Sequence, residues 1–290
     1  MKVVRRTAGA VALGVAMAAG LAVAGPVGPA AAGVAPPSYP GVVRGGNLWL
    51  LRDSQSVGPA TISFTYGSPT DTIHVMGDWN GDGTKTPGIV RIQGDLADSQ
   101  YVWYLRNSNS AGPADIKPFA YGKPSFGFEE PGDIPMVGDW DGDGKDTVGV
   151  VRRRNGQANT LFLLRNANTA GPATLAFPYG SISDAPAVTG DWDGTGSDTA
   201  GVIRNFGRGT LTWLLRNSNY HGQAQIQFNY GTGFDQPIVG DWNGDGVDGV
   251  GITRTFGTTR SWYLRNPLTS GPAETSFNYG RAADAPVVWK

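Results

Sequence analysis

The stretch from residue 235 to residue 280 decides the fold, and it reads DQPIVGDWNGDGVDGVGITRTFGTTRSWYLRNPLTSGPAETSFNYG. A short apolar segment at 238–239 precedes an acidic loop, and a second apolar segment follows the loop. A third segment ends at residues 264–265, and the Gly-Pro-Ala sequence at 271–273 favours a chain reversal. The aromatic alternation at 277–279 fits a fourth strand. The stretch therefore predicts four short antiparallel strands joined by tight turns.

The same unit occurs five times in the chain. A Leu-Arg-Asp or Leu-Arg-Asn sequence begins at Leu51, Leu105, Leu164, Leu215 and Leu264. A Phe-x-Tyr-Gly sequence begins at Phe64, Phe119, Phe177, Phe228 and Phe277. The repeats start near residues 41, 88, 149, 201 and 251. Four strands repeated about every 50 residues are typical of the blades of a β-propeller.

Two other repeat architectures fit these observations less well. A parallel β-helix needs much shorter repeats, and a linear array would require each all-β unit to stand alone. A unit of about 50 residues without disulfides buries too little surface for that. We therefore predict an all-β fold, a five-bladed β-propeller of four-stranded antiparallel blades, over residues 41–290.

The two ends of the repeat region look like two parts of one blade. Residues 42–44, 48–52 and 61–66 match strands two to four of the unit and lack strand one. Residues 284–289 match the strand-one segment at 235–239 and then stop. Pairing the carboxy-terminal strand with the three amino-terminal strands closes the ring and leaves no free sheet edge. This pairing also explains why five sets of strands come with four acidic loops.

The four acidic loops, residues 78–83, 139–144, 191–196 and 241–246, read Asp-x-Asp/Asn-x-Asp-Gly, except that Thr195 holds position 5 of the third. Calcium binds about six to eight oxygen atoms, and a tightly wound loop can turn alternate side chains inward to supply them. Glycine at positions 4 and 6 permits the winding. Magnesium fits less well, because it retains its water ligands. The predicted calcium ligands at positions 1, 3 and 5 are Asp78, Asn80, Asp82, Asp139, Asp141, Asp143, Asp191, Asp193, Thr195, Asp241, Asn243 and Asp245.

With these loops set between strands, residues 41–290 resemble the FG-GAP and VCBS repeat families, whose loops of this kind join the first two strands of propeller blades, as in the integrin α head. The resemblance implies calcium at the blade edges, held by the loop positions named above. Those families usually place a further Asp at position 9, where this chain has Thr86, Thr147, Thr199 and Gly249. Either position 8 supplies the last ligand, or the coordination is completed differently. The position-8 candidates are Asp146, Asp198 and Asp248, and Lys85 occupies that position in the first loop.

Two further kinds of repeated residue have alternative interpretations. The tryptophans at loop position 2 pack between blades or form sugar-stacking platforms; they are Trp79, Trp140, Trp192 and Trp242. The repeated arginines pair with repeated aspartates or with carbonyl groups. The arginines are Arg44, Arg52, Arg91, Arg106, Arg152, Arg165, Arg204, Arg216, Arg254 and Arg265, and the aspartates are Asp71, Asp133, Asp184, Asp235 and Asp284.

The first 32 residues are typical of an export signal. A basic start at residues 2–6 precedes an uncharged stretch at residues 8–24. Cleavage after Ala32 is favoured over cleavage after Ala24, and residues 33–40 would then be a linker. A retained membrane anchor is the alternative, but the apolar stretch is short for a span of about 20 residues. We therefore expect a secreted, extracellular protein without stable membrane insertion.

Charge and cysteine content narrow the class of partner. Removing residues 1–32 takes away three basic and no acidic residues, which changes the formal charge from -1 to -4. A mildly acidic surface argues against nucleic acid as a partner, because binding it needs clustered Lys and Arg. The chain has no cysteine, so a bound metal is the expected means of stiffening an extracellular domain.

We expect a monomeric binding or scaffold module for an extracellular protein or glycan, with no catalytic residues. A glycosidase-like enzyme is the alternative, since five-bladed propellers also host such enzymes, which need two facing carboxyl groups. Acids outside the repeated positions are few, and neither His74 nor His221 has a nucleophile motif nearby. The least repetitive stretch, residues 123–131, is an insertion where a partner could dock, or a tolerated long loop.

Overall fold

The computed structural model describes residues 36–95, 98–125, 132–153, 156–205 and 209–290. The chain divides into two units, residues 1–33 and Val34–Lys290. The second unit is the repeat region, whereas the expected export signal at residues 1–32 lies outside the described residues. Within the described ranges, no helix is long and apolar enough to span a membrane.

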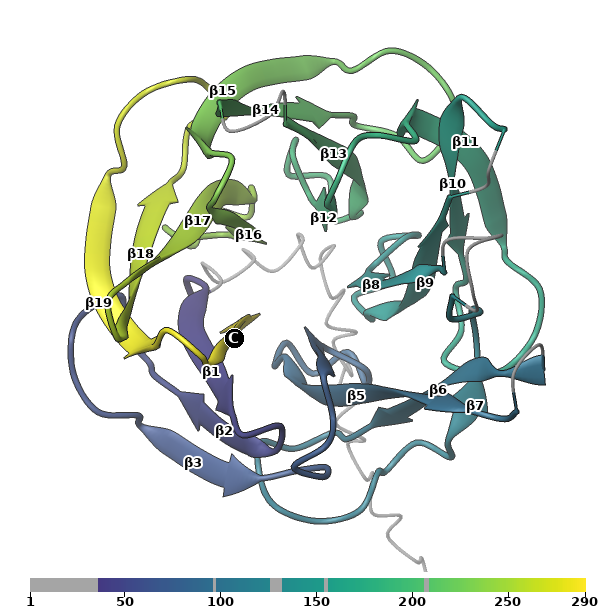
Figure 1. Ribbon diagram of the computed structural model, residues 1–290, viewed down its shortest axis with the longest axis horizontal. Helices are drawn as coiled ribbons and strands as arrows, with labels where there is room; N and C mark the ends of the chain where they lie inside the picture. Colours follow the sequence, from purple (N-terminus) through teal and green to yellow (C-terminus); the bar gives the residue numbers. More distant parts are fainter. Residues whose placement is uncertain (1–35, 96–97, 126–131, 154–155, 206–208) are drawn as a thin grey trace, which may run out of the picture. The chain divides into compact units, whose positions relative to one another are not determined.

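The repeat region is all-β, and its strands form five four-stranded antiparallel sheets arranged as the blades of a propeller (Figure 1). Blade 1 consists of β20 (Ala285–Trp289), β1 (Tyr39–Arg44), β2 (Leu48–Leu51) and β3 (Ile62–Thr65). Blade 2 consists of β4 (Ile73–Gly77), β5 (Thr86–Gln93), β6 (Gln100–Leu105) and β7 (Phe119–Ala120). Blade 3 consists of β8 (Ile134–Gly138), β9 (Thr147–Arg152), β10 (Asn159–Leu164) and β11 (Leu175–Ser181). Blade 4 consists of β12 (Ala187–Gly190), β13 (Thr199–Asn205), β14 (Thr210–Leu215) and β15 (Ile226–Thr232), and blade 5 of β16 (Gln236–Gly240), β17 (Gly249–Phe256), β18 (Thr259–Arg265) and β19 (Thr275–Arg281).

The carboxy-terminal strand closes the ring, which confirms the prediction from the two ends of the repeat region. β20 pairs antiparallel with β1, and Val287 lies opposite Gly41 while Trp289 lies opposite Tyr39. The first strands of neighbouring blades contact one another around the axis, in the order β4, β8, β12, β16, β20 and back to β4 (Figure 1). Because β1 has β20 on one side and β2 on the other, neither of its hydrogen-bonding edges is free.

Each hydrophobic core extends from one blade into the next. In blade 2, Trp79, Trp103 and Phe119 pack together with Val148 and Val150 of blade 3. The aromatic residue of the third strand is fully buried in every blade, and these residues are Trp49, Trp103, Phe162, Trp213 and Trp262. Large aromatic side chains dominate the burial of apolar area. A single blade is too small to bury such residues alone, so packing between blades supplies the core.

The Phe-x-Tyr sequences add hydrogen bonds between blades. In three of them the tyrosine hydroxyl donates to a third-strand carbonyl of the next blade, in the pairs Tyr121–Leu163, Tyr179–Leu214 and Tyr279–Leu50, at 3.1, 3.0 and 3.0 Å. The last of these joins blade 5 to blade 1 and therefore spans the closure of the ring. The buried hydroxyl of Tyr66 has no hydrogen-bond partner within the described part of the chain.

One set of repeated arginines pairs with the repeated aspartates. In each blade the guanidinium of the second-strand arginine binds a nearly buried carboxylate at 2.6–2.7 Å, in the pairs Arg44–Asp284, Arg91–Asp71, Arg152–Asp133, Arg204–Asp184 and Arg254–Asp235. The first pair joins the two ends of the repeat region. Burial alone would raise the pKa of Asp284, but the hydrogen bonds that it accepts from Arg44 and from the backbone of Arg281 lower it below the usual value.

The other set of arginines binds carbonyl groups of the turns that read Gly-Pro-Ala in four blades and Gly-Gln-Ala in blade 4. Arg106 donates through Nη1 to the carbonyl of Pro113 at 2.6 Å and through Nε to the carbonyl of Ser110 at 2.8 Å. A Cβ atom on Gly112 would lie 2.6 Å from this guanidinium, so only glycine leaves room for it. The equivalent arginines are Arg52, Arg165, Arg216 and Arg265. Both interpretations of the repeated arginines therefore hold, one for each set.

The tyrosine hydroxyls allow a matched test of the contact between blades 5 and 1. Tyr279→Phe removes the hydrogen bond to Leu50 and should lower the free energy of unfolding by about 1 kcal/mol. Tyr66→Phe removes a buried hydroxyl without a partner, and its effect should be neutral or stabilising. Chemical denaturation of both variants measures the difference, and equal losses of stability in the two would contradict this role of the Tyr279 hydroxyl.

Candidate metal centre

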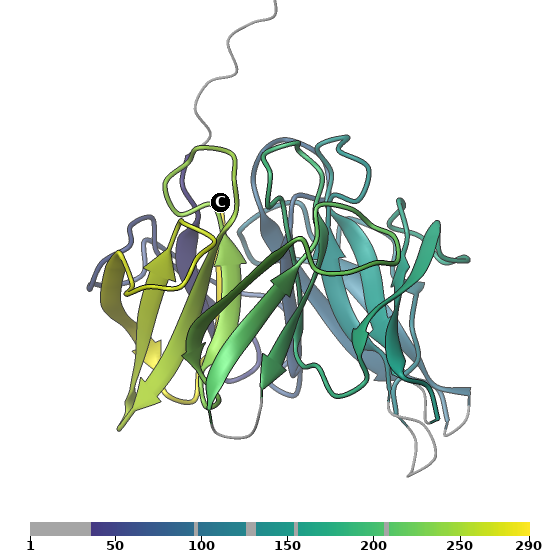
Figure 2. The same ribbon diagram turned by 90° about the horizontal axis from the view of Figure 1, so that it is seen from above.

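The four acidic loops join the first and second strands of blades 2 to 5. They follow β4, β8, β12 and β16, whose ends lie at the same end of the propeller as the end of β20 (Figure 2). Blade 1 has no such loop, because its first strand is the carboxy-terminal β20. The repeat thus brings four equivalent loops to one rim of the ring.

The aspartate at loop position 1 holds the winding of the loop. In the second loop, the carboxylate of Asp139 accepts hydrogen bonds from the backbone N–H groups of Gly142, Asp143 and Gly144, at 2.8, 3.2 and 2.7 Å. Gly142 and Gly144 have φ angles of 74° and 84°, a left-handed conformation that suits glycine. Glycines at positions 4 and 6 of the other loops have the same conformation. The predicted reason for these glycines is therefore confirmed.

The second loop could hold a metal ion. One carboxylate oxygen each of Asp139, Asp141 and Asp143 lie within 4.8 Å of one another. Burial raises the pKa of Asp139, since its charged form loses contact with water, although hydrogen bonds from the loop backbone act in the opposite direction. A cation among the three carboxylates would offset the cost of burying the charge of Asp139 and the repulsion between the three negative charges.

The other loops place the same positions together with different donors. In the first loop Asn80 Nδ2 donates to Asp82 Oδ2 at 2.9 Å, and in the fourth Asn243 Nδ2 donates to Asp245 Oδ2 at 2.8 Å. In the third loop, Thr195 Oγ1 donates to an oxygen of Asp193 at 2.8 Å. Positions 3 and 5 therefore face each other in all four loops. Their first residues, Asp78, Asp191 and Asp241, bind the loop backbone as Asp139 does.

The tryptophans at loop position 2 are core residues. Trp79, Trp140, Trp192 and Trp242 are only 3–4% exposed. The ring of Trp140 covers Gly138, where an added Cβ would lie 2.6 Å from the ring. Of the two interpretations of these residues, packing is confirmed, and sugar stacking on their faces is wrong because a sugar cannot reach them.

The aspartates at loop position 8 do not join the residues of their own loops. Asp146, for example, lies outside the group formed by Asp139, Asp141 and Asp143. Its Oδ2 instead accepts the backbone N–H of Asp78, in the loop of the preceding blade, at 2.7 Å. Asp198 and Asp248 bind the preceding loops in the same way, at 3.0 and 2.9 Å.

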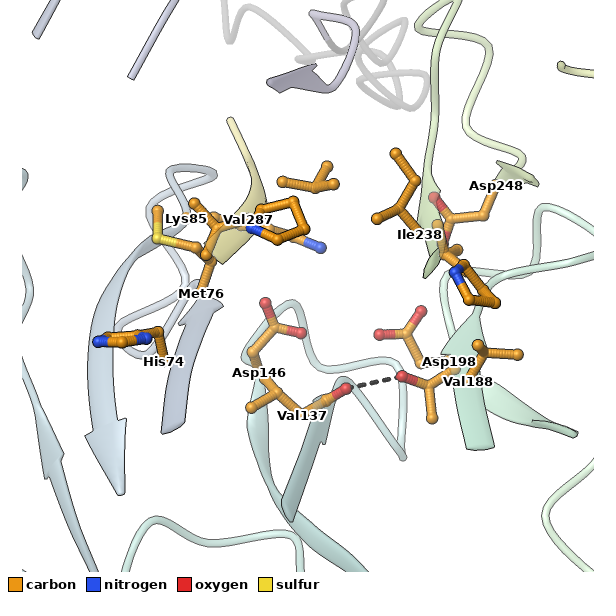
Figure 3. Close-up of a pocket in the computed structure, with 15 residues that line it drawn as sticks. His74, Met76, Lys85, Val137, Asp146, Val188, Asp198, Ile238, Asp248 and Val287 are labelled. Carbon is orange, nitrogen blue, oxygen red and sulfur yellow. Dashed lines mark hydrogen bonds between the residues drawn. The ribbon is translucent and has the colours of Figure 1, made fainter. Parts of the chain in front are cut away.

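The same three aspartates line an axial cavity together with Lys85. The cavity has a volume of about 260 Å³ and is walled by apolar residues of the first strands, including Val137, Val188, Ile238 and Val287. The ammonium of Lys85 and the three carboxylates point toward one shared space (Figure 3). Sequence reasoning missed this cluster, although a charged residue at position 8 of all four loops was the signal for it.

The charges in the cavity influence one another. Burial raises the pKa of Asp198 well above its usual value, and the charges of Asp146 and Asp248 raise it further. Burial also raises the pKa of Asp248 to about 6, against the attraction of Lys85. The negative charge of Asp146 raises the pKa of Lys85, which outweighs the effect of burial on the ammonium.

Of the two histidines, His74 also lines the axial cavity. His74 Nε2 bonds to the carbonyl of Gly46 at 2.8 Å, and burial lowers the pKa of its ring. His221 is exposed. Of the insertion at 123–131, residues 126–131 lie outside the described part of the chain.

Comparisons with known proteins identify no relative of this chain. No protein-family model matches the chain, and no curated protein or solved structure matches it.

The raised pKa of Asp248 predicts a stability that depends on pH. The folded protein binds more protons than the unfolded chain between the usual value of 3.8 and about 6, so stability falls as pH rises through that range. Asp248→Asn keeps an oxygen for the N–H of Asp191 but removes the titration. Between pH 4 and 7, without divalent ions, the wild-type protein should lose about 2 kcal/mol more unfolding free energy than the variant. Parallel pH profiles in the two proteins would contradict the shift.

Proposed function

We propose that the protein is a secreted calcium-binding β-propeller that serves as a binding or scaffold module for an extracellular protein or glycan. The convergence of Asp139, Asp141 and Asp143 in a loop repeated in four blades carries this proposal. The ligands at positions 1, 3 and 5 are those that the sequence predicts. The resemblance of the loops to FG-GAP and VCBS repeats supports the same assignment.

The donor set favours calcium over other metals. The atoms with which the side chains at loop positions 1, 3 and 5 can bind a metal are all oxygen atoms, from Asp, Asn or Thr, and the chain has no cysteine. Oxygen donors suit calcium and magnesium, whereas sulfur and imidazole suit transition metals. Magnesium retains most of its waters, whereas calcium accepts a wound loop of carboxylates and carbonyls. When bound, calcium would neutralise clustered carboxylates and fix the loop at the rim of the ring.

Calcium at these loops would contribute measurably to stability. Extracellular modules bind calcium with dissociation constants of about 0.1–1 mM. At a free calcium concentration of about 1 mM, each site then adds roughly 0.4–1.4 kcal/mol by mass action. Four such sites are substantial beside the unfolding free energy of an ordinary domain, about 5–15 kcal/mol.

The partner is proposed to be an extracellular protein or glycan. The export-type amino terminus favours secretion, and the acidic surface disfavours nucleic acid. A rigid ring that presents loops is a common way to position a binding surface. A glycan array probed with the full chain, with and without calcium, separates the two kinds of partner. Calcium-dependent signal favours a glycan, and a blank array with successful protein pull-down favours a protein.

A glycosidase-like enzyme is the second candidate, and the axial cavity is the observation that favours it. Carboxyl groups of Asp146, Asp198 and Asp248 point into this cavity (Figure 3), and glycoside hydrolysis uses two facing carboxyl groups. Their hydrogen bonds to neighbouring loops explain all three without catalysis, so the binding role is preferred. Hydrolysis of a panel of aryl glycosides that is lost in Asp198→Asn would favour the enzyme instead.

The third loop offers a test of the calcium assignment by gain of function. Thr195 supplies a hydroxyl where the other loops supply a carboxylate, so the third site should bind calcium most weakly. Thr195→Asp should strengthen calcium binding at this site severalfold and increase the rise in melting temperature that calcium produces. Isothermal titration and thermal melts with calcium or with excess chelator measure both quantities.

Two outcomes would contradict the calcium assignment. The first is a melting temperature that does not change in excess chelator. The second is an equal gain with Thr195→Asp and with Thr84→Asp, a matched substitution at loop position 7 of the first loop, outside the proposed ligands.

A further inference from the structure

The position-8 aspartates connect neighbouring loops through reciprocal hydrogen bonds. Asp198 Oδ2 accepts the backbone N–H of Asp139 at 3.0 Å, and the N–H of Asp198 donates to the carbonyl of Asp139 at 2.7 Å. The same two bonds join Asp146 to Asp78 and Asp248 to Asp191. Both backbone groups of the first residue in each of these loops are therefore held by the following blade.

The residue held in this way is the proposed first metal ligand. The carboxylate of Asp139 organises its own loop through the N–H groups of Gly142, Asp143 and Gly144. If the backbone of Asp139 moves, this carboxylate moves with it, and the three amides lose their acceptor. The shape of the second loop thus depends on Asp198, which belongs to the third loop.

Two of the three position-8 aspartates are also held within their own blades. Asn168 Nδ2 donates to the carbonyl of Asp146 at 3.0 Å, and Asn219 Nδ2 donates to the carbonyl of Asp198 at 2.8 Å. A second contact links neighbouring loops, because an added Cβ on Gly142 would lie 2.7 Å from Ser197 Oγ. In these two blades the backbone that carries the carboxylate is therefore anchored where the carboxylate holds the preceding loop.

The fourth loop lacks this carboxylate and serves as an internal comparison. Blade 1 has no acidic loop, and Ser38 takes the place of the aspartate there. The N–H of Ser38 donates to the carbonyl of Asp241 at 2.6 Å, and among the described residues no side chain accepts the N–H of Asp241. In the first loop, position 8 is Lys85, and the preceding blade, blade 1, has no acidic loop to hold.

We propose that Asp146, Asp198 and Asp248 are positioning residues that hold the calcium loop of the preceding blade in its ion-binding shape. The inference rests on the calcium function proposed above. In this proposal the calcium affinity of each of the first three loops depends on an aspartate of the next blade. A change in one loop therefore affects the loop before it and not the loop after it. The fourth loop depends on no such aspartate.

Hydrogen exchange read by mass spectrometry tests this assignment in the full chain. Asp198→Ala should speed exchange of the amides at 139–144 by about five- to tenfold, the factor expected for one lost hydrogen bond. It should also raise the calcium concentration that protects those amides, while the amides at 191–196, in the loop that precedes Asp198, change little. Asp193→Ala, which removes a carboxylate from the same third loop, should show the reverse pattern.

The conservative variant keeps the test decisive if Asp198→Ala does not fold. Asp198→Asn retains an oxygen that can accept the N–H of Asp139, so calcium protection at 139–144 should stay near that of the wild type. A loss of calcium protection confined to 191–196 in either variant would overturn the proposal and make Asp198 a calcium ligand of its own loop.

The wild-type protein tests the calcium function separately. If calcium does not slow exchange in the wild-type loops, the calcium function is refuted. In that case faster exchange at 139–144 in calcium-free Asp198→Ala would still support the positioning role, and unchanged exchange there would overturn it.

Discussion

The pairing of β20 with β1 is the constraint on which the rest of the propeller depends. Without β20, blade 1 would lose its axial strand and expose the edge of β1. The core of blade 1 would lose Val287 and Trp289, which pack there with Trp49. The ion pair between Arg44 and Asp284 would also be absent. A ring of small blades is stable only if every blade has two neighbours, so one pairing affects all five.

Closure of the ring also determines what the rim can do. Each of the first three acidic loops lies beside the loop of the next blade, and the contacts between them include backbone groups of the proposed first ligands. The same geometry brings Lys85, Asp146, Asp198 and Asp248 from four blades to one axial cavity. The four loops are therefore a connected series along the rim and not four independent sites. The carboxylate contacts between loops run from Asp248 in the fourth loop to Asp78 in the first.

The sequence predicts the fold well because each step rests on a repeated local pattern. Blade number, strand positions and closure follow from the aromatic, turn and strand-one sequences, and the glycines at loop positions 4 and 6 follow from the winding. The direction of the position-8 side chains could not be predicted, because it depends on how one blade is rotated against the next. The two interpretations of Trp140 required the same information, and its burial decides between them.

A disulfide between β1 and β20 tests the closure of the ring most directly. Val43 lies opposite Ala285 in the antiparallel pair, and residues so placed have Cα atoms close enough for a disulfide. The chain has no other cysteine. A Val43→Cys/Ala285→Cys protein should form the bond on mild oxidation of the folded protein, whereas Val43→Cys/Ala185→Cys, with the second cysteine just before β12 of blade 4, should not. Two free thiols in the first protein after native oxidation would contradict the closure, and formation of the disulfide would support it.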